Sequence, residues 1–267
     1  MRPRSPDVPP VGSNVVHRQQ FTWDRLTVTC ILSFCLLVAG LSVGLILGEL
    51  RDELDLSGLL AAAHGAMFGI GLLFAGTVGL RLVARVGRPV AFWTSCASIV
   101  AGVLVLSVGR TWTVTLFGAT VSGFACAFLV MLMPGIVADH HGEHRASAFA
   151  VINGFPGLAG ITFSLVIGGV LAAGGTWRLP YAILTVLIGI TVAVSSRRTS
   201  IPRSDSQPTG VLPLFRLPSV RGPWLHIVHS VMVEFPVGIW AVVYLKEVGG
   251  ASSGLAAALG PLSRSQC

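Results

Sequence analysis

Residues 26–48 read LTVTCILSFCLLVAGLSVGLILG, a run of 23 residues without a charged side chain. A helix rises about 1.5 Å per residue, so a run of this length crosses the roughly 30 Å hydrocarbon core of a bilayer. The run is continuously apolar, whereas the strands of a membrane barrel alternate between apolar and polar residues. The sequence therefore predicts a transmembrane helix here.

Similar runs recur along the chain. We predict seven membrane spans and then a short apolar segment, at residues 26–48, 57–80, 89–108, 112–137, 146–171, 178–195, 223–245 and 251–262. Of the 267 residues, 53% are hydrophobic and 11% are charged, whereas soluble domains carry roughly 25% charged residues. These properties predict an all-α membrane protein.

The basic residues indicate how the chain is oriented. With a cytoplasmic N-terminus, the inner segments hold 13 Lys and Arg residues and the outer loops hold 4. This bias follows the positive-inside rule, so we expect a cytoplasmic N-terminus and location in the plasma (inner) membrane. The net charge of +7 is then a topology signal. We expect the lipid bilayer as a partner and no nucleic acid.

The spacing of the spans suggests four parts. Residues 1–25 form a polar cytoplasmic tail, residues 26–195 a six-helix bundle, and residues 196–222 a basic linker rich in Ser, Pro and Arg. Residues 223–267 hold the seventh span and about a dozen apolar residues of an eighth, fewer than the ~17–25 that cross a bilayer. This order is typical of the first part of a two-bundle transporter, so we expect an incomplete chain.

The loop between the second and third spans carries a recognisable pattern. Arg85, Gly87 and Arg88 lie in the stretch ARVGRP at residues 84–89. This stretch resembles the signature loop of the major facilitator superfamily, in which an acid, a basic residue, Gly and Arg follow each other. In this sequence the acidic position is Ala84, and the leading glycine of the family pattern is Leu80.

Two further stretches resemble the same family. Arg145 lies in a short loop that resembles the second copy of the signature, and residues 175–178 (GTWR) resemble the usual entry to the sixth helix. The resemblance covers roughly residues 26–260. It implies a bundle of two three-helix repeats, a signature loop that acts as a conformational latch, and transport of a small solute by alternating access. Many members are driven by ions or protons.

Glu234 is the most informative single residue, because it lies at the centre of the seventh span. A charged side chain there costs about 2.5–3.5 kcal/mol on insertion scales. Ser230 and His226 precede it by one and two helical turns, and Trp240 follows in an order that resembles sugar-permease-like members of the family. We predict that these four residues bind solute or couple protons, and that Pro236 bends the helix. The alternative is a protonated Glu234 that only bonds a neighbouring helix.

Two polar residues of the first six spans are further candidates for a cavity lining. His64 lies among small residues in the second span, although a lone His is more often a packing residue. Asn153 precedes Gly154 and Pro156, a combination expected to break the fifth span locally. Broken helices are where transporters present their backbone to solute, so we include both residues.

The stretch HHGEH at residues 140–144 raises the question of a metal site. It fits a zinc-protease pattern in which both histidines must share one helix face. Gly142 is expected to interrupt that helix, and no third ligand is evident in the sequence. We therefore expect no metal and no cofactor.

Three alternatives remain open. A seven-helix receptor or retinal protein would have an outside N-terminus, and a retinal protein needs a lysine in the middle of the seventh span, whereas Lys246 lies at its outer end. A membrane enzyme needs a polar catalytic constellation within the spans; we find none and expect no enzyme activity. A fragment or relic of a transporter shares every motif, and we expect that this chain alone does not transport.

Replacing Glu234 with Gln in a complete transporter is expected to abolish coupled transport and to leave membrane insertion normal, because only the ionisable group is lost. Solute uptake and its dependence on pH measure the effect. Unchanged uptake with an unchanged pH profile would show that Glu234 has no part in coupling.

Overall fold

Asp24 begins the helical part of the chain as a capping residue. The computed structural model of the protein describes residues 23–196, 199–203 and 217–259. The Asp24 carboxylate accepts a hydrogen bond from the Thr27 amide at 2.8 Å, which satisfies a free N–H group in the first turn of the first helix. All regular elements within the described ranges are helices.

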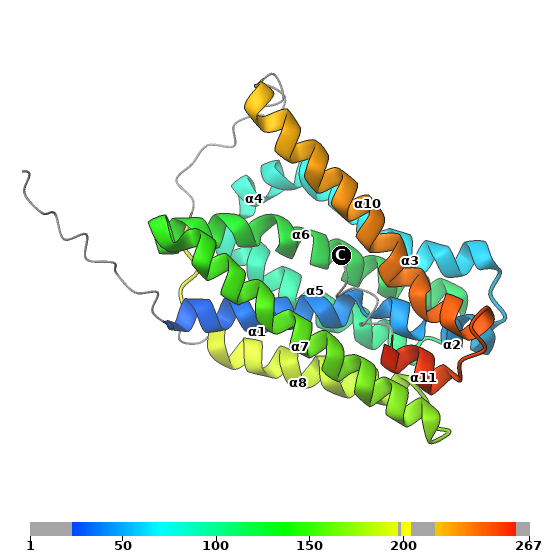
Figure 1. Cartoon of the computed structure of the whole chain (residues 1–267). Helices are drawn as coiled ribbons and strands as arrows, with labels where there is room; N and C mark the ends of the chain where they lie inside the picture. Colours follow the sequence, from blue (N-terminus) through cyan, green and yellow to red (C-terminus); the bar gives the residue numbers. More distant parts are fainter. Residues whose placement is uncertain (1–22, 197–198, 204–216, 260–267) are drawn as a thin grey trace, which may run out of the picture.

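The helices follow one another as predicted for a membrane bundle. In chain order they are α1 (Arg25–Leu41), α2 (Val43–Leu54), α3 (Gly58–Phe74), the π-helical turn η1 (Ala75–Gly79), α4 (Leu80–Val86), α5 (Arg88–Val108), α6 (Trp112–His141), the 3₁₀ turn η2 (Gly142–His144), α7 (Arg145–Ala172), α8 (Arg178–Ser196), α10 (Pro218–Glu247) and α11 (Ser253–Leu259). Five stretches of the described chain are long and apolar enough to cross a membrane: Arg25–Leu54, Gly58–Val86, Arg88–Val108, Trp112–Ala172 and Arg178–Ser195. The fourth holds both α6 and α7, which reverse direction at η2 (Figure 1). The six spans predicted for the first bundle are therefore confirmed as helices.

The helices are longer than the apolar runs that predicted them. The first span continues in α2 to Leu54, and the second continues in α4 to Val86. Arg85 thus lies in a helix, and the predicted loop shrinks to Gly87, whose φ of 86° favours glycine. Our loop boundaries at both places were wrong, because a helix can continue with polar residues past the hydrocarbon core.

The break expected near Asn153 is also wrong. α7 runs without interruption through Asn153, Gly154 and Pro156. α10 is also continuous through Pro236, and the bend predicted there stays a prediction. A proline removes only one backbone donor, so the hydrogen bonds of the flanking turns can hold the helix together.

An interruption that the sequence does not predict lies within the first span. Ser42 separates α1 from α2, and its hydroxyl donates to the Val38 carbonyl at 2.7 Å. The Ala39 carbonyl accepts the Ser42 amide at 3.2 Å and the buried Tyr181 hydroxyl at 2.8 Å. Backbone groups in lipid need partners inside the protein, so Tyr181 of α8 stabilises the break.

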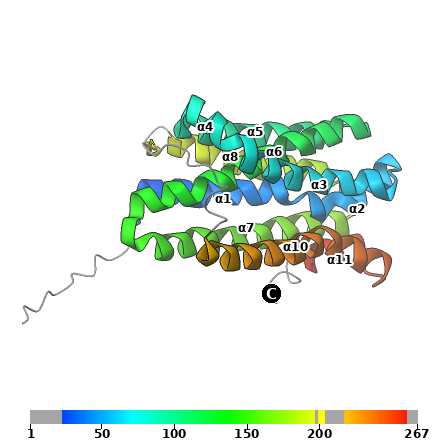
Figure 2. The same ribbon diagram turned by 90° about the horizontal axis from the view of Figure 1, so that it is seen from above.

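α1 lies in the middle of the bundle. It contacts α5 and α8 on one side and α7 on the other, and α10 and α11 lie on the α7 side (Figure 2). Two clusters of buried side chains fill the interior. One includes Phe92 and Met133, and the other includes Phe163 and Tyr181.

Small residues bring α5 and α6 together. A Cβ atom added to Gly118 of α6 would lie 2.5 Å from the Leu106 nitrogen, and one added to Gly102 of α5 would lie 2.6 Å from the Ser122 nitrogen. Apolar burial gives a helix little advantage over lipid tails, so association depends on such close backbone approach.

Gly118→Ala is expected to lower the melting temperature of the purified chain, because overpacking of this kind costs about 1–3 kcal/mol. Gly69→Ala in α3 is the matched control, since an added Cβ there meets no atom within 4 Å. Equal melting temperatures for the two variants would contradict the role given to the α5–α6 contact.

Candidate functional site

The two ends of the bundle carry different contacts. We call one the Glu53 end; it holds the α2–α3, α5–α6 and α7–α8 turns and the end of α10. We call the other the Asp24 end; it holds the start of α1, the α4–α5 and α6–α7 turns and the end of α8 (Figure 1). The contacts that join α10 to the first bundle lie at the Glu53 end.

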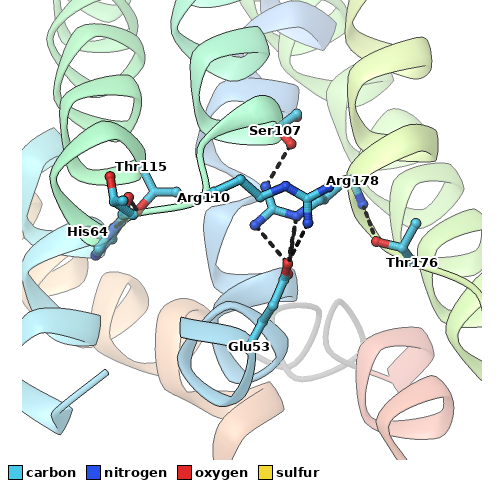
Figure 3. A network of polar contacts seen from close by, with 8 residues as sticks. Glu53, His64, Ser107, Arg110, Thr115, Thr176 and Arg178 are labelled. Atoms are coloured by element: carbon cyan, nitrogen blue, oxygen red, sulfur yellow. Dashed lines mark hydrogen bonds and ion pairs between the residues drawn. The ribbon is translucent and has the colours of Figure 1, made fainter. Parts of the chain in front are cut away.

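Arg178 joins three helix ends at the Glu53 end. Its Nε atom donates to both carboxylate oxygens of Glu53 at 3.0 and 3.1 Å, and its Nη1 atom donates to the Ser107 carbonyl at 2.7 Å (Figure 3). The guanidinium lies 4.7 Å from the centre of the Trp177 ring. Because Arg178 is only 8% exposed, its charge depends on these partners. They tie the start of α8 to the ends of α2 and α5.

Two acids next to Glu53 on α2 hold α10 through ion pairs. The Lys246 Nζ atom lies 3.0 Å from Glu49 and 2.6 Å from Asp52, and Arg51 pairs with Glu247. Partial burial by itself would lower the pKa of Lys246, but hydrogen bonds to Asp52 and Glu49 outweigh it and hold the pKa above its usual value. Lys246 is therefore a charged bridge between α10 and two acids of α2.

α11 adds a close packing contact at the same end. A Cβ atom added to Gly168 of α7 would lie 2.7 Å from the Gly254 carbonyl oxygen of α11. Ala256 and Ala257 of α11 are buried. As between α5 and α6, the two backbones approach closely because the residues between them are small.

Toward the Asp24 end, α10 diverges from the bundle. α7 and α10 lie in one layer in Figure 2. In Figure 1 the two helices lie close together at the Glu53 end and move apart toward the Asp24 end. The main helical contacts of α10 are with α2 and α11, both at the Glu53 end. The described part of the chain is thus joined at one end and separated at the other.

The signature loop makes one defined contact. Arg88 Nη1 donates to Asp139 Oδ2 at 2.5 Å, which links the first turn of α5 to the last turns of α6. Arg88 therefore has a carboxylate partner although Ala84 stands at the acidic position of the family pattern. Arg85 and Arg145, the other basic residues predicted for the latch, are exposed.

His64 and Asn153 make contacts within the first bundle. The His64 Nδ1 atom donates to the Leu60 carbonyl at 2.7 Å, and its Nε2 atom lies 3.0 Å from the Thr115 hydroxyl of α6 (Figure 3). His64 is 2% exposed, which is the setting of a packing histidine. Asn153 is exposed, and its Nδ2 atom donates to the Phe149 carbonyl at 2.8 Å. A solute role for either residue stays a prediction.

The other solute candidates lie on α10. His226, Ser230 and Trp240 are exposed, and the side chain of Glu234 lies outside the described residues. His226 and Ser230 are four residues apart, so they share one face of the helix. Among the side chains that the structure describes, no hydrogen bond joins one solute candidate to another.

Comparison with known proteins identifies the family. A family model described as the Major Facilitator Superfamily matches residues 28–263. The chain therefore belongs to the major facilitator superfamily, a family of membrane transporters, and it is an integral membrane protein. No curated protein sequence matches it significantly.

Solved transporter structures share the fold. A bacterial homologue of the human lysosomal transporter Spinster matches with a TM-score of 0.66 and 17% identity, over 90% of this chain and 59% of that chain. A D-xylose–proton symporter matches with a TM-score of 0.60 and 15% identity, over 89% and 65%. A peptide transporter in complex with sulfate matches with a TM-score of 0.59 and 16% identity, over 89% and 65%. The chain spans about three fifths of the length of these proteins.

The residues that build the Glu53 end do not stand out in the sequence. Glu49, Asp52 and Glu53 appear there as an acidic segment after the first span. Their partners Arg178 and Lys246 are 125 residues from Glu53 and 197 residues from Glu49, respectively. The sequence offers one signal for them. Asp52 and Glu53 follow Glu49 by three and four residues, which places the three acids on neighbouring positions of a helix.

Glu53→Gln is expected to destabilise the chain, because Arg178 would keep its buried charge without a counter-charge. Breaking a fully buried pair costs about 3–5 kcal/mol. The Glu53 side chain is 33% exposed, so we expect a smaller loss of about 1–3 kcal/mol, measured by thermal unfolding in a membrane mimetic.

Arg110→Gln is the control for this variant. Arg110 also pairs with Glu53, at 3.4 Å, but its side chain is 78% exposed, and exposed pairs contribute less than about 1 kcal/mol. A loss in Arg110→Gln as large as that in Glu53→Gln would mean that the buried Arg178 pair is not what stabilises this end.

Proposed function

We propose that this chain takes part in secondary active transport of a small solute by alternating access. The observation that carries the proposal is the position of α10, which is joined to the six-helix bundle at the Glu53 end and diverges from it toward the Asp24 end. Alternating access opens a midplane site to one side at a time, so it requires a closure that can break and re-form. The ion pairs of Lys246 with α2 have that character, because they are partly exposed to water.

We infer that the Glu53 end faces the outside and the Asp24 end faces the cytoplasm. The support is the charge bias, with 13 basic residues in the predicted inner segments and 4 in the outer loops. In this orientation the chain is closed to the outside, which is an inward-facing arrangement. The similar Spinster homologue is itself described in an inward-facing, unoccupied conformation.

Glu234 is the residue that we propose for proton coupling, with His226 and Ser230 on the approach to it. A carboxylate at the membrane midplane is costly when charged and becomes neutral on protonation, so proton binding there can favour one state over another. The D-xylose–proton symporter supports protons as the coupling ion, and together with the peptide transporter it supports a small organic solute.

A second candidate function is that of a family member that does not transport by itself. The observation that favours it is the coverage of 59% and 65% of the similar transporters. Such a chain would keep the junction between α2 and α10 but would not respond to a solute. Solute-dependent movement of α10 therefore separates the two candidates.

Lys246→Gln is expected to open the Glu53 end. Each partly exposed ion pair contributes up to about 1 kcal/mol, so losing both should raise the population separated at this end roughly fivefold or more. Spin labels at Leu59→Cys and Val248→Cys report the Glu53 end, and labels at Val86→Cys and Leu225→Cys report the Asp24 end; all four side chains are exposed. Pulsed electron paramagnetic resonance in nanodiscs should show that the distance at the Glu53 end lengthens and the distance at the Asp24 end shortens.

Arg110→Gln is again the matched control, because it removes a positive charge at the same end that bonds only within the first bundle. Its two distances should equal those of the parent chain. Distances that stay fixed in Lys246→Gln, or that both lengthen, would contradict alternating access.

The same labelled chain tests for a solute. Pools of sugars, short peptides and organic acids are added at two pH values, and a pool that binds one state more tightly must shift the distance distribution. A transporter is expected to respond to at least one pool, and Glu234→Gln is expected to lose the pH dependence of the response. No response to any pool would favour the non-transporting candidate.

A further inference from the structure

Three side chains of the types that bind metal ions meet at the Asp24 end. Asp24 precedes α1, whereas His140 and His141 lie in the last turn of α6. His140 is 116 residues from Asp24 in the sequence. One ligand atom from each residue can be chosen so that all three lie within 4.8 Å of one another. Two imidazoles and a carboxylate thus converge from two different helices.

Hydrogen bonds hold the three groups in this arrangement. The His140 Nε2 atom donates to Asp24 Oδ2. The Thr27 hydroxyl donates to Asp24 Oδ1 at 2.6 Å, and it lies 3.0 Å from the His141 Nε2 atom. The two rings are perpendicular, with centroids 4.8 Å apart. Because Asp24 also caps α1, its carboxylate is fixed before any ion arrives.

We propose that Asp24, His140 and His141 bind a divalent transition-metal ion of the Zn²⁺ or Ni²⁺ class. Two imidazole nitrogens and one carboxylate oxygen form a borderline ligand set that these ions prefer to Mg²⁺ or Ca²⁺. Zinc–ligand bonds of about 2.0–2.2 Å place ligand atoms roughly 3.4 Å apart, so small side-chain rotations from the observed spacing complete the site. His140 then presents its Nε2 lone pair to the ion and carries its ring proton on Nδ1.

The surroundings suit an ion that exchanges with water. The side chains of Asp24 and His140 are each 35% exposed. Asp24 also lines a cavity of about 530 Å³ together with Arg25 and Thr29. Water can therefore reach the ion and fill its remaining position, and the hydrogen bond from the Thr27 hydroxyl orients the Asp24 carboxylate.

This site differs from the one that the sequence pattern suggests. The HHGEH pattern at residues 140–144 would use His140 and His144 on one helix, but α6 ends at His141, and Gly142 turns the chain with a φ of 52°. The third ligand instead comes from Asp24, which is far away in the sequence. A bound ion would link the start of α1 to the end of α6 within the first bundle.

The test is metal binding by the full chain, purified with a tag that contains no histidine and stripped with a chelator. Isothermal titration with ZnCl₂ and with NiCl₂ should show one bound ion per chain. Thermal unfolding should show a higher melting temperature with the metal than without it, since an ion that binds only the folded state stabilises it. Neither measurement depends on transport, so the result is independent of the proposed function.

Two variants and a control assign the ligands. Asp24→Asn keeps a good helix cap but loses the charged ligand, and His140→Gln loses an imidazole. Each should weaken binding at least tenfold and lower the gain in melting temperature. His229→Gln changes an exposed histidine of α10 and should behave like the parent chain. The proposal is overturned if the parent chain binds neither ion, or if Asp24→Asn and His140→Gln bind as it does, which would leave only a hydrogen-bonded contact between α1 and α6.

Discussion

The acidic last turns of α2 carry the contacts on which the arrangement of the chain depends. Glu53 faces Arg178 of α8, whereas Glu49 and Asp52 face Lys246 of α10. One helix can serve both partners because its acids occupy neighbouring positions three and four residues apart. Charges at the edge of a bilayer need partners when water is scarce, so these acids fix the start of α8 and the end of α10.

The contacts of α2 differ in strength, and the difference suits a transporter. The Arg178 side chain is 9% exposed and that of Lys246 is 27% exposed, so the pair within the first bundle is shielded and the pairs with α10 are screened by water. Glycine-mediated contact between α5 and α6 further stiffens the first bundle. A rigid bundle with a reversible junction to α10 is the physical basis of the proposed closure at the Glu53 end.

Much of the fold follows from the sequence, because each apolar run is long enough to require a membrane helix. The residues that set the details do not follow from it. The break at Ser42 depends on Tyr181, a residue of another helix, and a helix continues through Pro156 although proline usually weakens helices. The proposed metal ligands His140 and His141 are visible in the sequence, but Asp24 becomes their neighbour only through packing of α1 on α6. Non-local contacts of this kind leave no periodic signal.

Thiol labelling of Ser230→Cys, at an exposed position of α10, tests whether the Glu53 end is closed. It shows whether a reagent reaches α10 only from the cytoplasmic side. The reagent is membrane-impermeant, and Cys267→Ser removes the terminal thiol. We expect labelling in inside-out vesicles and none in intact cells, because in the proposed orientation the junction of α2 with α10 closes the outer side. Labelling from the outside, or equal labelling from both sides, would contradict a chain closed at the Glu53 end.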